Sequence, residues 1–426
     1  MKTDKTPAIR FKGFTEAWEQ RRLGDVAEYR NGKAHECFIV DNGKYIVVNS
    51  KFVSTDGEII KKSYKQIEPL FKNEIAFVLS DVPNGKALAR TYLVEKDDKY
   101  TLNQRIAGLT PLQITDPYFL YILLNRNKYF LSFDDGAKQT NLSINDVKKF
   151  LGKYPSFNEQ KLIGIFFRNL DSLITLHQRK CDVLMNIKKS LLEKMFPADG
   201  DDKPRIRFKG FTEAWEQRRL GDVAEYRNGK AHECFIVDNG KYIVVNSKFV
   251  STDGEIIKKS YKQIEPLFKN EIAFVLSDVP NGKALARTYL VEKDDKYTLN
   301  QRIAGLTPLQ ITDPYFLYIL LNRNKYFLSF DDGAKQTNLS INDVKKFLGK
   351  YPSFNEQKLI GIFFRNLDSL ITLHQRKCDV LMNIKKSLLE KMFPADGDDK
   401  PRIRFKGFTE AWEQRKLHQI SLLSKG

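Results

Sequence analysis

Apolar residues recur every three or four positions between about Asn158 and Phe196. The main stripe falls at heptad positions: Ile163, Phe166, Leu170, Leu173, Leu184, Ile187 and Leu191. His177 and Lys180 take the corresponding places in the middle of this stripe. A second stripe of Phe167, Ile174 and Cys181 runs beside it. A heptad pattern kept over about 37 residues predicts a helix of roughly 55 Å that packs on another helix. Ser156–Glu159 has the spacing of a capping box and marks the start. Packing of the helix on its own domain is the alternative, because the apolar face is wide.

The segment before this helix alternates between strand-like and helix-like patterns. Asp116 followed by Pro117 predicts the cap and first turn of a helix that extends to about Phe133. Ser143–Asp146 predicts the start of a shorter helix, and the polar stretch Asp134–Leu142 before it a loop. Four runs rich in β-branched and aromatic residues predict strands: Lys44–Val53, Glu74–Ser80, Ala87–Val94 and Arg105–Ile114. Strands and helices of this kind together predict an α+β domain.

The whole pattern occurs twice. Residues Ile9–Arg205 are repeated without change as Ile206–Arg402, a displacement of 197 residues (206 − 9 = 197), and a third copy begins at Ile403 and stops matching after Arg415. Each repeat has the size of a domain rather than that of a solenoid unit of about 20–50 residues. We therefore expect two identically folded modules with internal two-fold symmetry, each binding the same ligand. Pro197–Arg205, with its Pro, Gly and Asp residues, is predicted to be a linker.

The composition indicates a soluble protein with an anionic partner. Hydrophobic residues make up 42% of the chain and charged residues 29%, which suffices for a core in each repeat and a polar surface. The net charge of +18 favours a polyanion such as nucleic acid, and a basic protein without such a partner is the alternative. The cysteines lack metal or disulfide spacing, so we expect reduced thiols in a cytoplasmic protein without a signal peptide or membrane span: Cys37, Cys181, Cys234 and Cys378.

No stretch of the sequence has the spacing of a catalytic or metal site. A G-x-x-x-x-G-K-[ST] loop for ATP is absent, and Asn84–Lys86 is a turn signal only. Asp116–Phe119 is similar to the D-P-P-Y motif of amino-methyltransferases but lacks the second proline, and the start of a helix explains it. We expect neither a catalytic residue nor a metal ligand on this chain. Two functions remain compatible with these observations: a stand-alone DNA-acting enzyme, such as a nuclease of unrecognised motif, and a helical scaffold protein.

Three stretches together make the chain resemble the DNA-specificity (S) subunit of type I restriction–modification enzymes. They are FKGFTEAWEQRRLGDVAEYRNGK, then NEIAFVLSDVPNGKALARTYLV with NQRIAGLTPLQITDPYFLYILL, and finally DDGAKQTNLSINDVKKFLGKYPSFNEQKLIGIFFRNLDSLITLHQRKCDVLMNIKKSLLEKMFP. The resemblance covers essentially the whole chain and respects the repeat. It rests on the order of the stretches, the repeat and the heptad helices rather than on one motif.

The resemblance implies two globular α+β target-recognition domains separated by two long antiparallel coiled-coil helices, with pseudo-two-fold symmetry. It implies a non-catalytic subunit that binds double-stranded DNA, two methyltransferase subunits and restriction subunits. Those partners would hold S-adenosylmethionine, ATP and Mg, and this chain no cofactor. Members of the family usually read an asymmetric bipartite site with two different domains. Because the two domains are identical here, a palindromic site is expected.

The resemblance also sets the expected domain boundaries. The expected segments are a conserved N-terminal segment (1–22), the first recognition domain (23–155), the first spacer helix (156–197), a linker with a conserved segment (198–219), the second recognition domain (220–352), the second spacer helix (353–394) and a conserved C-terminal segment that is the partial third repeat (395–426). In the family the C-terminal segment does after the second helix what the central segment does after the first.

Polar segments of each repeat are candidates for DNA contact. The loop Lys138–Asn141 leads into a helix N-terminus at Ser143, where free backbone N–H groups suit a phosphate, and Gln139 and Asn141 can pair bidentately with adenine. A solvated loop that caps the helix is the alternative. The remaining candidates lie in strand-like segments or are cationic residues suited to phosphates, and each has a copy in the second repeat. The full set is Lys33, Asn49, Ser50, Lys51, Arg90, Asn103, Gln104, Arg105, Lys138, Gln139, Thr140, Asn141, Ser143, Lys230, Asn246, Ser247, Lys248, Arg287, Asn300, Gln301, Arg302, Lys335, Gln336, Thr337, Asn338 and Ser340.

Overall fold

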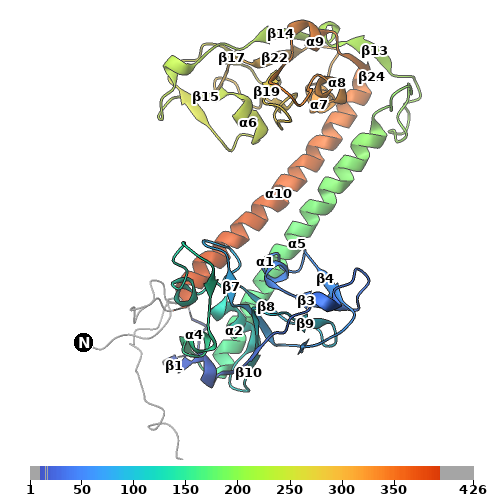
Figure 1. Ribbon diagram of the computed structural model, residues 1–426. Helices are drawn as coiled ribbons and strands as arrows, with labels where there is room; N and C mark the ends of the chain where they lie inside the picture. The colour runs from blue at the N-terminus through green and yellow to red at the C-terminus, as the bar shows by residue number, and fades with distance from the viewer. Residues whose placement is uncertain (1–9, 15, 17, 394–426) are drawn as a thin grey trace, which may run out of the picture. The chain divides into compact units, whose positions relative to one another are not determined.

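The computed structural model of the chain describes residues 10–14, 16 and 18–393 (Figure 1). The chain divides into two compact units: unit 1 is Met1–His177 with Lys377–Gly426, and unit 2 is Gln178–Arg376. The boundary between the units falls within both long helices, so each helix begins in one unit and ends in the other. The third repeat, predicted to be a conserved C-terminal segment, lies outside the described residues.

Both repeats contain the same elements in the same order. Those of the first are β1 (Glu19–Arg22), β2 (Ala27–Asn31), β3 (Tyr45–Val48), α1 (Ser50–Ser54), β4 (Lys61–Ser63), β5 (Pro69–Leu70), β6 (Ile75–Val78), β7 (Ser80–Asp81), β8 (Thr91–Leu93), β9 (Tyr100–Leu102), β10 (Ile106–Pro111), α2 (Pro117–Leu124), α3 (Lys128–Leu131), β11 (Thr140–Asn141), α4 (Ile144–Lys148), β12 (Leu151–Tyr154) and α5 (Phe157–Met195). Those of the second are β13 (Glu216–Arg219), β14 (Ala224–Asn228), β15 (Tyr242–Val245), α6 (Ser247–Ser251), β16 (Lys258–Ser260), β17 (Pro266–Leu267), β18 (Ile272–Val275), β19 (Ser277–Asp278), β20 (Thr288–Leu290), β21 (Tyr297–Leu299), β22 (Ile303–Pro308), α7 (Pro314–Leu321), α8 (Lys325–Leu328), β23 (Thr337–Asn338), α9 (Ile341–Lys345), β24 (Leu348–Tyr351) and α10 (Phe354–Met392). The predicted linker after α5 has no helix or strand.

Two four-stranded sheets form the centre of the globular part of unit 1. One has the order β2-β10-β6-β8 and is antiparallel, and the other has the order β4-β3-β9-β5 with β3 and β9 parallel. Strand β6 is buried on both faces. Ile75 and Phe77 join the core that contains α2 and the start of α5, whereas Ala76 and Val78 join the core of the second sheet. The period of two along the strand therefore assigns alternate side chains to two cores.

The predicted strand Lys44–Val53 is only half correct. Strand β3 ends at Val48, and Asn49 then caps the short helix α1 by accepting a hydrogen bond at Oδ1 from the Phe52 N–H at 2.9 Å. Phe52 and Val53 still reach the core of the second sheet, but from a helical turn. A short apolar run separated by polar residues is compatible with both conformations, so the hydrophobic pattern alone did not separate them.

The predicted helix from Asp116 to about Phe133 is broken in the middle. Its start is confirmed, because Asp116 accepts a hydrogen bond from the Phe119 N–H at 2.9 Å and Pro117 takes the first helical position. Helix α2 ends at Leu124, and Arg126 has a left-handed φ of +54°. The Arg126 N–H donates to the Ala89 oxygen at 2.8 Å, so a contact with a distant turn ends the helix.

The predicted strand Ala87–Val94 is shortened for a related reason. Only Thr91–Leu93 forms strand β8, and Ala89 has a left-handed φ of +55°. The Leu88 N–H donates to the Asp81 carboxylate at 3.1 Å, which holds the first residues of this run in a turn. Predicted strands Glu74–Ser80 and Arg105–Ile114 correspond to β6 and β10.

The long helix is confirmed, and its buried face differs from the predicted stripe. Phe166, Leu173 and Ile187 are more than a third exposed, Leu173 by 47%. Phe167, Ile174 and Lys188 take the places of these three residues on the buried face. Each lies four positions after a buried or half-buried residue of the predicted stripe. The buried and half-buried positions therefore follow the alternating spacing of four and three: Ile163, Phe167, Leu170, Ile174, His177, Cys181, Leu184, Lys188, Leu191 and Met195. We call this set the inner stripe.

Each unit contains a pair of antiparallel helix segments. In unit 1, Lys385 of α10 pairs with Asp171 of α5, and Phe393 contacts Phe167 at 6.4 Å between ring centroids. The partner number rises as the α5 number falls, which defines antiparallel packing. In unit 2 the same pairs recur with the helices exchanged, Lys188 with Asp368 at 2.6 Å and Phe196 with Phe364 at 6.4 Å. The start of each helix also packs on the recognition domain before it, so both predicted modes of packing occur.

Candidate nucleic-acid interface

The turn Asn103–Arg105 between β9 and β10 brings three of the predicted DNA-contacting segments together. The Asn103 N–H donates to the Val48 oxygen at 3.1 Å, next to the predicted segment Asn49–Lys51. The Gln104 N–H donates to the Lys33 oxygen at 3.0 Å. Segments that are distant in the sequence thus lie side by side.

The row of backbone contacts continues to the predicted loop. The Leu79 N–H donates to the Arg105 oxygen at 3.0 Å, and the Leu142 N–H donates to the Leu79 oxygen at 2.8 Å. Strand β7 then pairs with β11, which carries Thr140 and Asn141. The equivalent bonds in unit 2 have lengths of 3.1, 3.0, 3.0 and 2.8 Å. We call these hydrogen-bonded segments the loop row: Lys33, Asn49–Lys51, Leu79–Lys86, Asn103–Arg105 and Lys138–Asn141.

The turn Val82–Lys86 belongs to the loop row, although its sequence indicated only a turn. The Asp81 carboxylate accepts hydrogen bonds from the Val82 N–H at 2.9 Å and the Leu88 N–H at 3.1 Å, which fixes both ends of the turn. A Cβ on Gly85 would lie 2.1 Å from the Asp81 Oδ2, so only glycine fits there. The Asn84 N–H donates to the Asp134 Oδ2 at 3.1 Å and ties the turn to the predicted loop. The turn is therefore held rigidly beside Lys138–Asn141.

Cationic residues surround this turn. Lys86 and Lys138 are exposed, and Arg126 donates to the Gly85 oxygen at 3.3 Å. Arg90 donates to the Lys86 oxygen at 3.2 Å, and its guanidinium lies 3.7 Å from the Asp56 carboxylate. Lys86 and Arg126 were not among the predicted site residues. An asparagine–glycine–lysine turn directly after a buried strand was the signal that could have indicated Lys86.

The side chains of the predicted loop have separate roles. The Gln139 amide donates to the Ser80 Oγ at 2.9 Å and the Asn141 Oδ1 at 3.1 Å, and both Gln139 and Asn141 are exposed. Thr140 is buried and donates to the Asp134 carboxylate at 3.3 Å, so it anchors the loop. The Asp135 carboxylate accepts hydrogen bonds from the backbone N–H groups of Ala137 and Lys138, and these bonds lower the pKa of Asp135. The loop therefore presents two amide side chains on an ordered backbone.

The predicted phosphate site at Ser143 stays a prediction, and it has a carboxylate beside it. Helix α4 starts there as predicted, but its N-terminus has a complete capping box. The Asp146 N–H donates to the Ser143 Oγ at 3.1 Å, and the Ser143 N–H donates to the Asp146 carboxylate at 2.8 Å. The carboxylate engages one of the N–H groups that a phosphate would need, and its negative charge weakens the attraction for an anion. The same box is present at Ser340.

The turn Gln104–Arg105 projects from the loop row. Arg105 is exposed and has a left-handed φ of +65°, which places it at the tip of the turn. The Gln104 amide donates to the Glu36 carboxylate at 2.8 Å, so its donor is already engaged. In the neighbouring segment the Asn49 side chain caps α1, while Lys51 is exposed. Arg105 and Lys51 are thus the exposed cationic side chains of these two segments, whereas the exposed Gln104 is bonded to Glu36.

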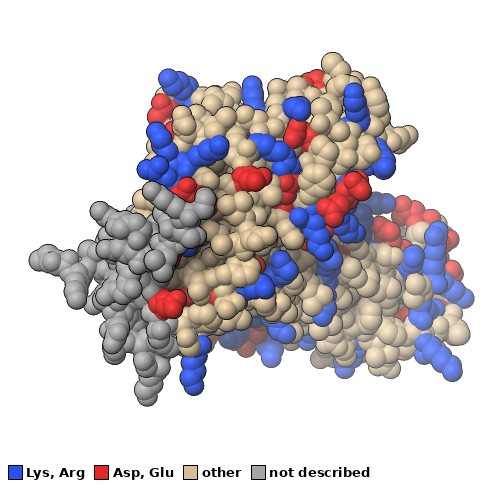
Figure 2. Space-filling model, turned by 90° about the horizontal axis from the view of Figure 1, so that it is seen from below, with Lys and Arg blue, Asp and Glu red and all other residues tan. Residues whose placement is uncertain are grey.

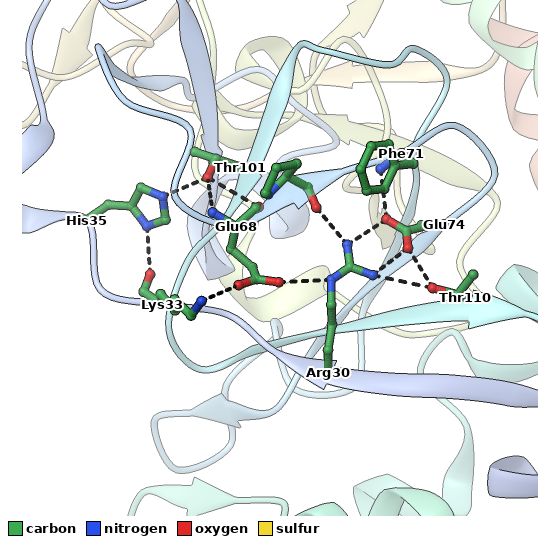
Figure 3. A network of polar contacts seen from close by, with 9 residues as sticks. Arg30, Lys33, His35, Glu68, Phe71, Glu74, Thr101 and Thr110 are labelled. Carbon is green, nitrogen blue, oxygen red and sulfur yellow. Dashed lines mark hydrogen bonds and ion pairs between the residues drawn. The ribbon is translucent and has the colours of Figure 1, made fainter.

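A network of ion pairs lies beneath one end of the loop row (Figure 3). Lys33 pairs with Glu68 at 2.9 Å, and the same carboxylate accepts a hydrogen bond from the Arg30 Nε at 3.1 Å. Arg30 also holds Glu74 through both terminal nitrogens. Burial alone raises the pKa of Glu74, but the Arg30 guanidinium and the Phe71 N–H bring it below its ordinary value. The charge of Lys33 is therefore partly neutralised, which weakens its predicted role at a phosphate.

His35 fixes the backbone at Lys33. Its ring is buried, with Nδ1 2.6 Å from the Lys33 oxygen and Nε2 2.7 Å from the Thr101 Oγ1. Because a carbonyl oxygen can only accept, Nδ1 carries the proton. The histidine is a structural tie between β9 and the end of β2, as Figure 3 shows.

The surface charge is dispersed. On the face drawn in Figure 2, Lys and Arg side chains are scattered among Asp and Glu rather than gathered in one patch. No group of three or more His, Cys, Asp or Glu within the described ranges could hold a metal ion. In the same part of the chain no helix is long and apolar enough to cross a membrane.

Comparison with known proteins identifies the family. The chain matches the family described as the type I restriction modification DNA specificity domain over residues 15–186 and again over residues 212–383. The chain belongs to this family. The match respects the repeat and confirms the predicted role, a DNA-recognition subunit of a type I restriction–modification system. The family is the specificity part of such systems.

Relatives of similar length support this assignment. The type I restriction enzyme MjaVIII specificity subunit of Methanocaldococcus jannaschii is 22% identical over 403 residues, which cover 88% of this chain and 91% of that protein. The putative MjaX specificity subunit of the same organism is 22% identical over 418 residues, with coverage of 88% and 92%. The crystal structure of a type I S subunit from M. genitalium is 19% identical, has a TM-score of 0.62 and covers 92% of this chain and 99% of that one. The predicted fold class is thereby confirmed.

Proposed function

We propose that this chain reads a palindromic bipartite DNA site through its two loop rows. The observation that carries the proposal is that the same residues form the same row of contacts in both units, 197 residues apart (206 − 9 = 197). Identical surfaces read identical half-sites, and the antiparallel helix pairing inside each unit supports an inverted order of the half-sites. Gln139 and Asn141 are the proposed base readers, because both are exposed and amide side chains pair with adenine in the major groove. On DNA the Gln139 amide would exchange its bonds to Ser80 and Asn141 for bonds to the base.

We propose that the phosphates are held by exposed cationic residues of the loop row. Lys86, Lys138 and Arg105 are exposed and belong to the same loop row as the amide side chains. Phosphate contacts set the register of a protein on DNA, while base contacts select the sequence.

The chemistry of the complex is proposed to lie on other chains. The chain would act as a non-catalytic subunit that places methyltransferase and restriction subunits, which would hold S-adenosylmethionine, ATP and Mg. A further set of apolar residues along α5, which we call the outer stripe, supports docking of such partners. It lies outside the inner stripe, is more than a third exposed, and recurs on α10: Leu162, Ile165, Phe166, Leu173, Leu176, Val183 and Ile187. Exposed apolar surface of this extent marks protein–protein contacts.

Methylome sequencing tests the proposal about DNA. Cells that carry this chain and its methyltransferase should show one palindromic modified motif with half-sites roughly one helical turn, about 10 bp, apart. Gln336→Ala in unit 2 alone should relax one half-site and make the motif asymmetric, whereas the same change at Gln139 and Gln336 together should relax both. A non-palindromic motif from the unaltered chain would sink the symmetric reading.

Co-purification tests the proposal about partners. Leu173→Glu with Leu370→Glu should prevent capture of the methyltransferase subunit and leave DNA binding by the isolated chain unchanged, because both leucines are exposed. Leu112→Glu with its copy Leu309→Glu is the control, since Leu112 is exposed on a recognition domain and does not belong to the outer stripe. Equal loss of capture in both variants would contradict docking on the outer stripe.

A further inference from the structure

Each unit has a docking site for the opening segment of a repeat at the start of its long helix. In unit 2 the Arg207 guanidinium donates to both oxygens of Glu356, at 2.7 and 2.8 Å, and Phe208 packs edge-on against Phe363 at 6.0 Å. In unit 1 the site is the same: Arg10 forms the equivalent bidentate pair with Glu159, and Phe11 packs edge-on against Phe166 at 6.0 Å.

A tryptophan completes the site. In unit 2, Trp215 is buried and contacts Phe196 at 5.7 Å and Phe316 at 5.8 Å. In unit 1, Trp18 is buried and contacts Phe393 and Phe119, both at 5.8 Å. Phe196, the first residue after α5, therefore contacts the tryptophan of the segment docked in unit 2. Phe393, the first residue after α10, contacts the tryptophan of the segment docked in unit 1.

The carboxylate at the centre of the site requires an arginine. The Glu159 side chain is 0% exposed and that of Glu356 1% exposed. A buried carboxylate that loses its cationic partner is strongly destabilised, so an empty site is unfavourable. Whichever arginine can reach the site is expected to occupy it.

The chain has three copies of the segment but two described sites. The sequence IRFKGFTEAWEQR occurs as Ile9–Arg21, Ile206–Arg218 and Ile403–Arg415. In unit 2 the docked copy is joined to α5 by residues 197–206, which follow Phe196. Residues 394–403, with the same sequence, follow Phe393. Because Phe393 in unit 1 stacks on Phe119 at 5.6 Å as Phe196 in unit 2 stacks on Phe316 at 5.6 Å, the third copy starts from an equivalent anchor with an equal linker.

We propose that the site on unit 1 is shared by two segments of the same chain, Arg10–Trp18 and Arg404–Trp412, which compete for it. The two segments have the same sequence, so they would make the same side-chain contacts with equal intrinsic affinity. Their occupancies are set by their tethers: Arg10–Trp18 is joined to β1, and Arg404–Trp412 is joined to Phe393. A short tether, such as residues 394–403, gives the attached segment a high effective concentration at the site. The segment that is not bound can therefore bind as soon as the other one leaves. Unit 2 has no such reserve, because its copy is fixed at both ends.

Fluorine NMR of the full chain tests this competition. The chain has 3 tryptophans, Trp18, Trp215 and Trp412, so 5-fluorotryptophan gives three signals that single Trp→Phe variants assign. In the variant Arg10→Ala, Phe11→Ala, Trp18→Ala, the Trp412 signal should move to the position of docked Trp215. In the matched variant Arg207→Ala, Phe208→Ala, Trp215→Ala it should stay where it is in the unaltered chain.

The proposal is overturned if the Trp412 signal of the first variant keeps the position it has in an isolated peptide of residues 403–426. The Trp215 signal shows in the same spectrum whether that variant is folded. A second measurement covers a variant that fails to fold. By urea unfolding, Arg10→Ala and Arg404→Ala should each cost less than Arg207→Ala, and together they should cost more than the sum of the two. Equal losses for Arg10→Ala and Arg207→Ala, with no further loss on adding Arg404→Ala, would also overturn it.

Discussion

Removal of four lysines from the two loop rows should flatten the salt dependence of DNA binding. The variant carries Lys86→Ala, Lys138→Ala and the same changes at Lys283 and Lys335, all of which are exposed. Each lysine that neutralises a phosphate contributes about 0.9 to the slope of log affinity against log salt, so four contribute about 3.6. Between 50 and 200 mM salt the unaltered chain should therefore lose about 100-fold more affinity than the variant.

A matched pair of lysines provides the control. Lys33 and its copy Lys230 lie on the same loop rows but are paired with Glu68 at 2.9 Å and with Glu265 at 3.0 Å. Because their charge is already partly neutralised, Lys33→Ala with Lys230→Ala should change the slope by less than two unpaired lysines would.

Fluorescence anisotropy with labelled duplexes measures these slopes. Titrations at several salt concentrations, with one duplex that contains the modified motif and one that is scrambled, should show the same change of slope for both, because phosphate contacts carry no sequence information. If the four-lysine variant keeps the original slope while the Lys33 and Lys230 variant loses it, the DNA lies along the Glu68 end of the surface, and the reasoning from exposed charge is wrong.

Four further changes test the proposed base readers, the ion-pair network and the helices. Gln139→Ala with Gln336→Ala should cost about 1–3 kcal/mol per base contact and relax one position in each half-site, as measured with a library of duplexes. Glu74→Gln should lower the free energy of unfolding by about 1–3 kcal/mol at neutral pH, because it removes a charged hydrogen-bond acceptor. Since the pKa of Glu74 is lowered in the folded chain, its contribution is present above the unfolded pKa of about 4.3, and urea unfolding should show the difference shrink as pH falls below about 4. Leu170→Ala should cost about 2–5 kcal/mol, whereas Leu173→Ala should stay within about 0.5 kcal/mol in the same assay, because the first is buried and the second exposed. Insertion of one heptad at matched points of both long helices should lengthen the unspecified spacer of the methylated motif, and an unchanged spacer would mean that other contacts set it.

The long helices show both the reach and the limit of hydrophobic periodicity. Length and start were predictable, because apolar residues at a period of 3.5 persist from Phe157 to Met195. The choice of stripe was not. Two heptad stripes share Ile163 and Leu170 and differ in whether the next member is three or four residues away. Both alternatives are apolar here, since the exposed stripe is apolar too, and only the position of the partner helix decides which one is buried.

The candidate site shows a similar division. Asn103–Arg105 and Lys138–Asn141 could be selected from the sequence, because polar residues interrupt or end apolar runs there. Their adjacency could not be predicted, because it depends on the pairing of β3 with β9 and of β7 with β11, which are far apart along the chain. The capping box at Ser143 was recognised in the sequence and is confirmed, and its Asp146 carboxylate competes with a phosphate for the helix N-terminus. Lys86 was overlooked because a turn sequence does not indicate which loop it contacts.

The division of the chain into units has a consequence for its synthesis on the ribosome. Unit 2 is a continuous stretch of chain, whereas the core of unit 1 joins Leu170 to Met392 and Phe393 near the other end. The 223 residues that separate Leu170 from Phe393 (393 − 170 = 223) take about 10–45 s to synthesise at 5–20 residues per second. During that time the inner stripe at the start of α5 is exposed, and the second unit can complete its core before the first. A neighbouring nascent chain that supplies its own last helix turn in this interval would produce an exchanged dimer, so rapid, crowded expression should favour dimers over the single closed chain.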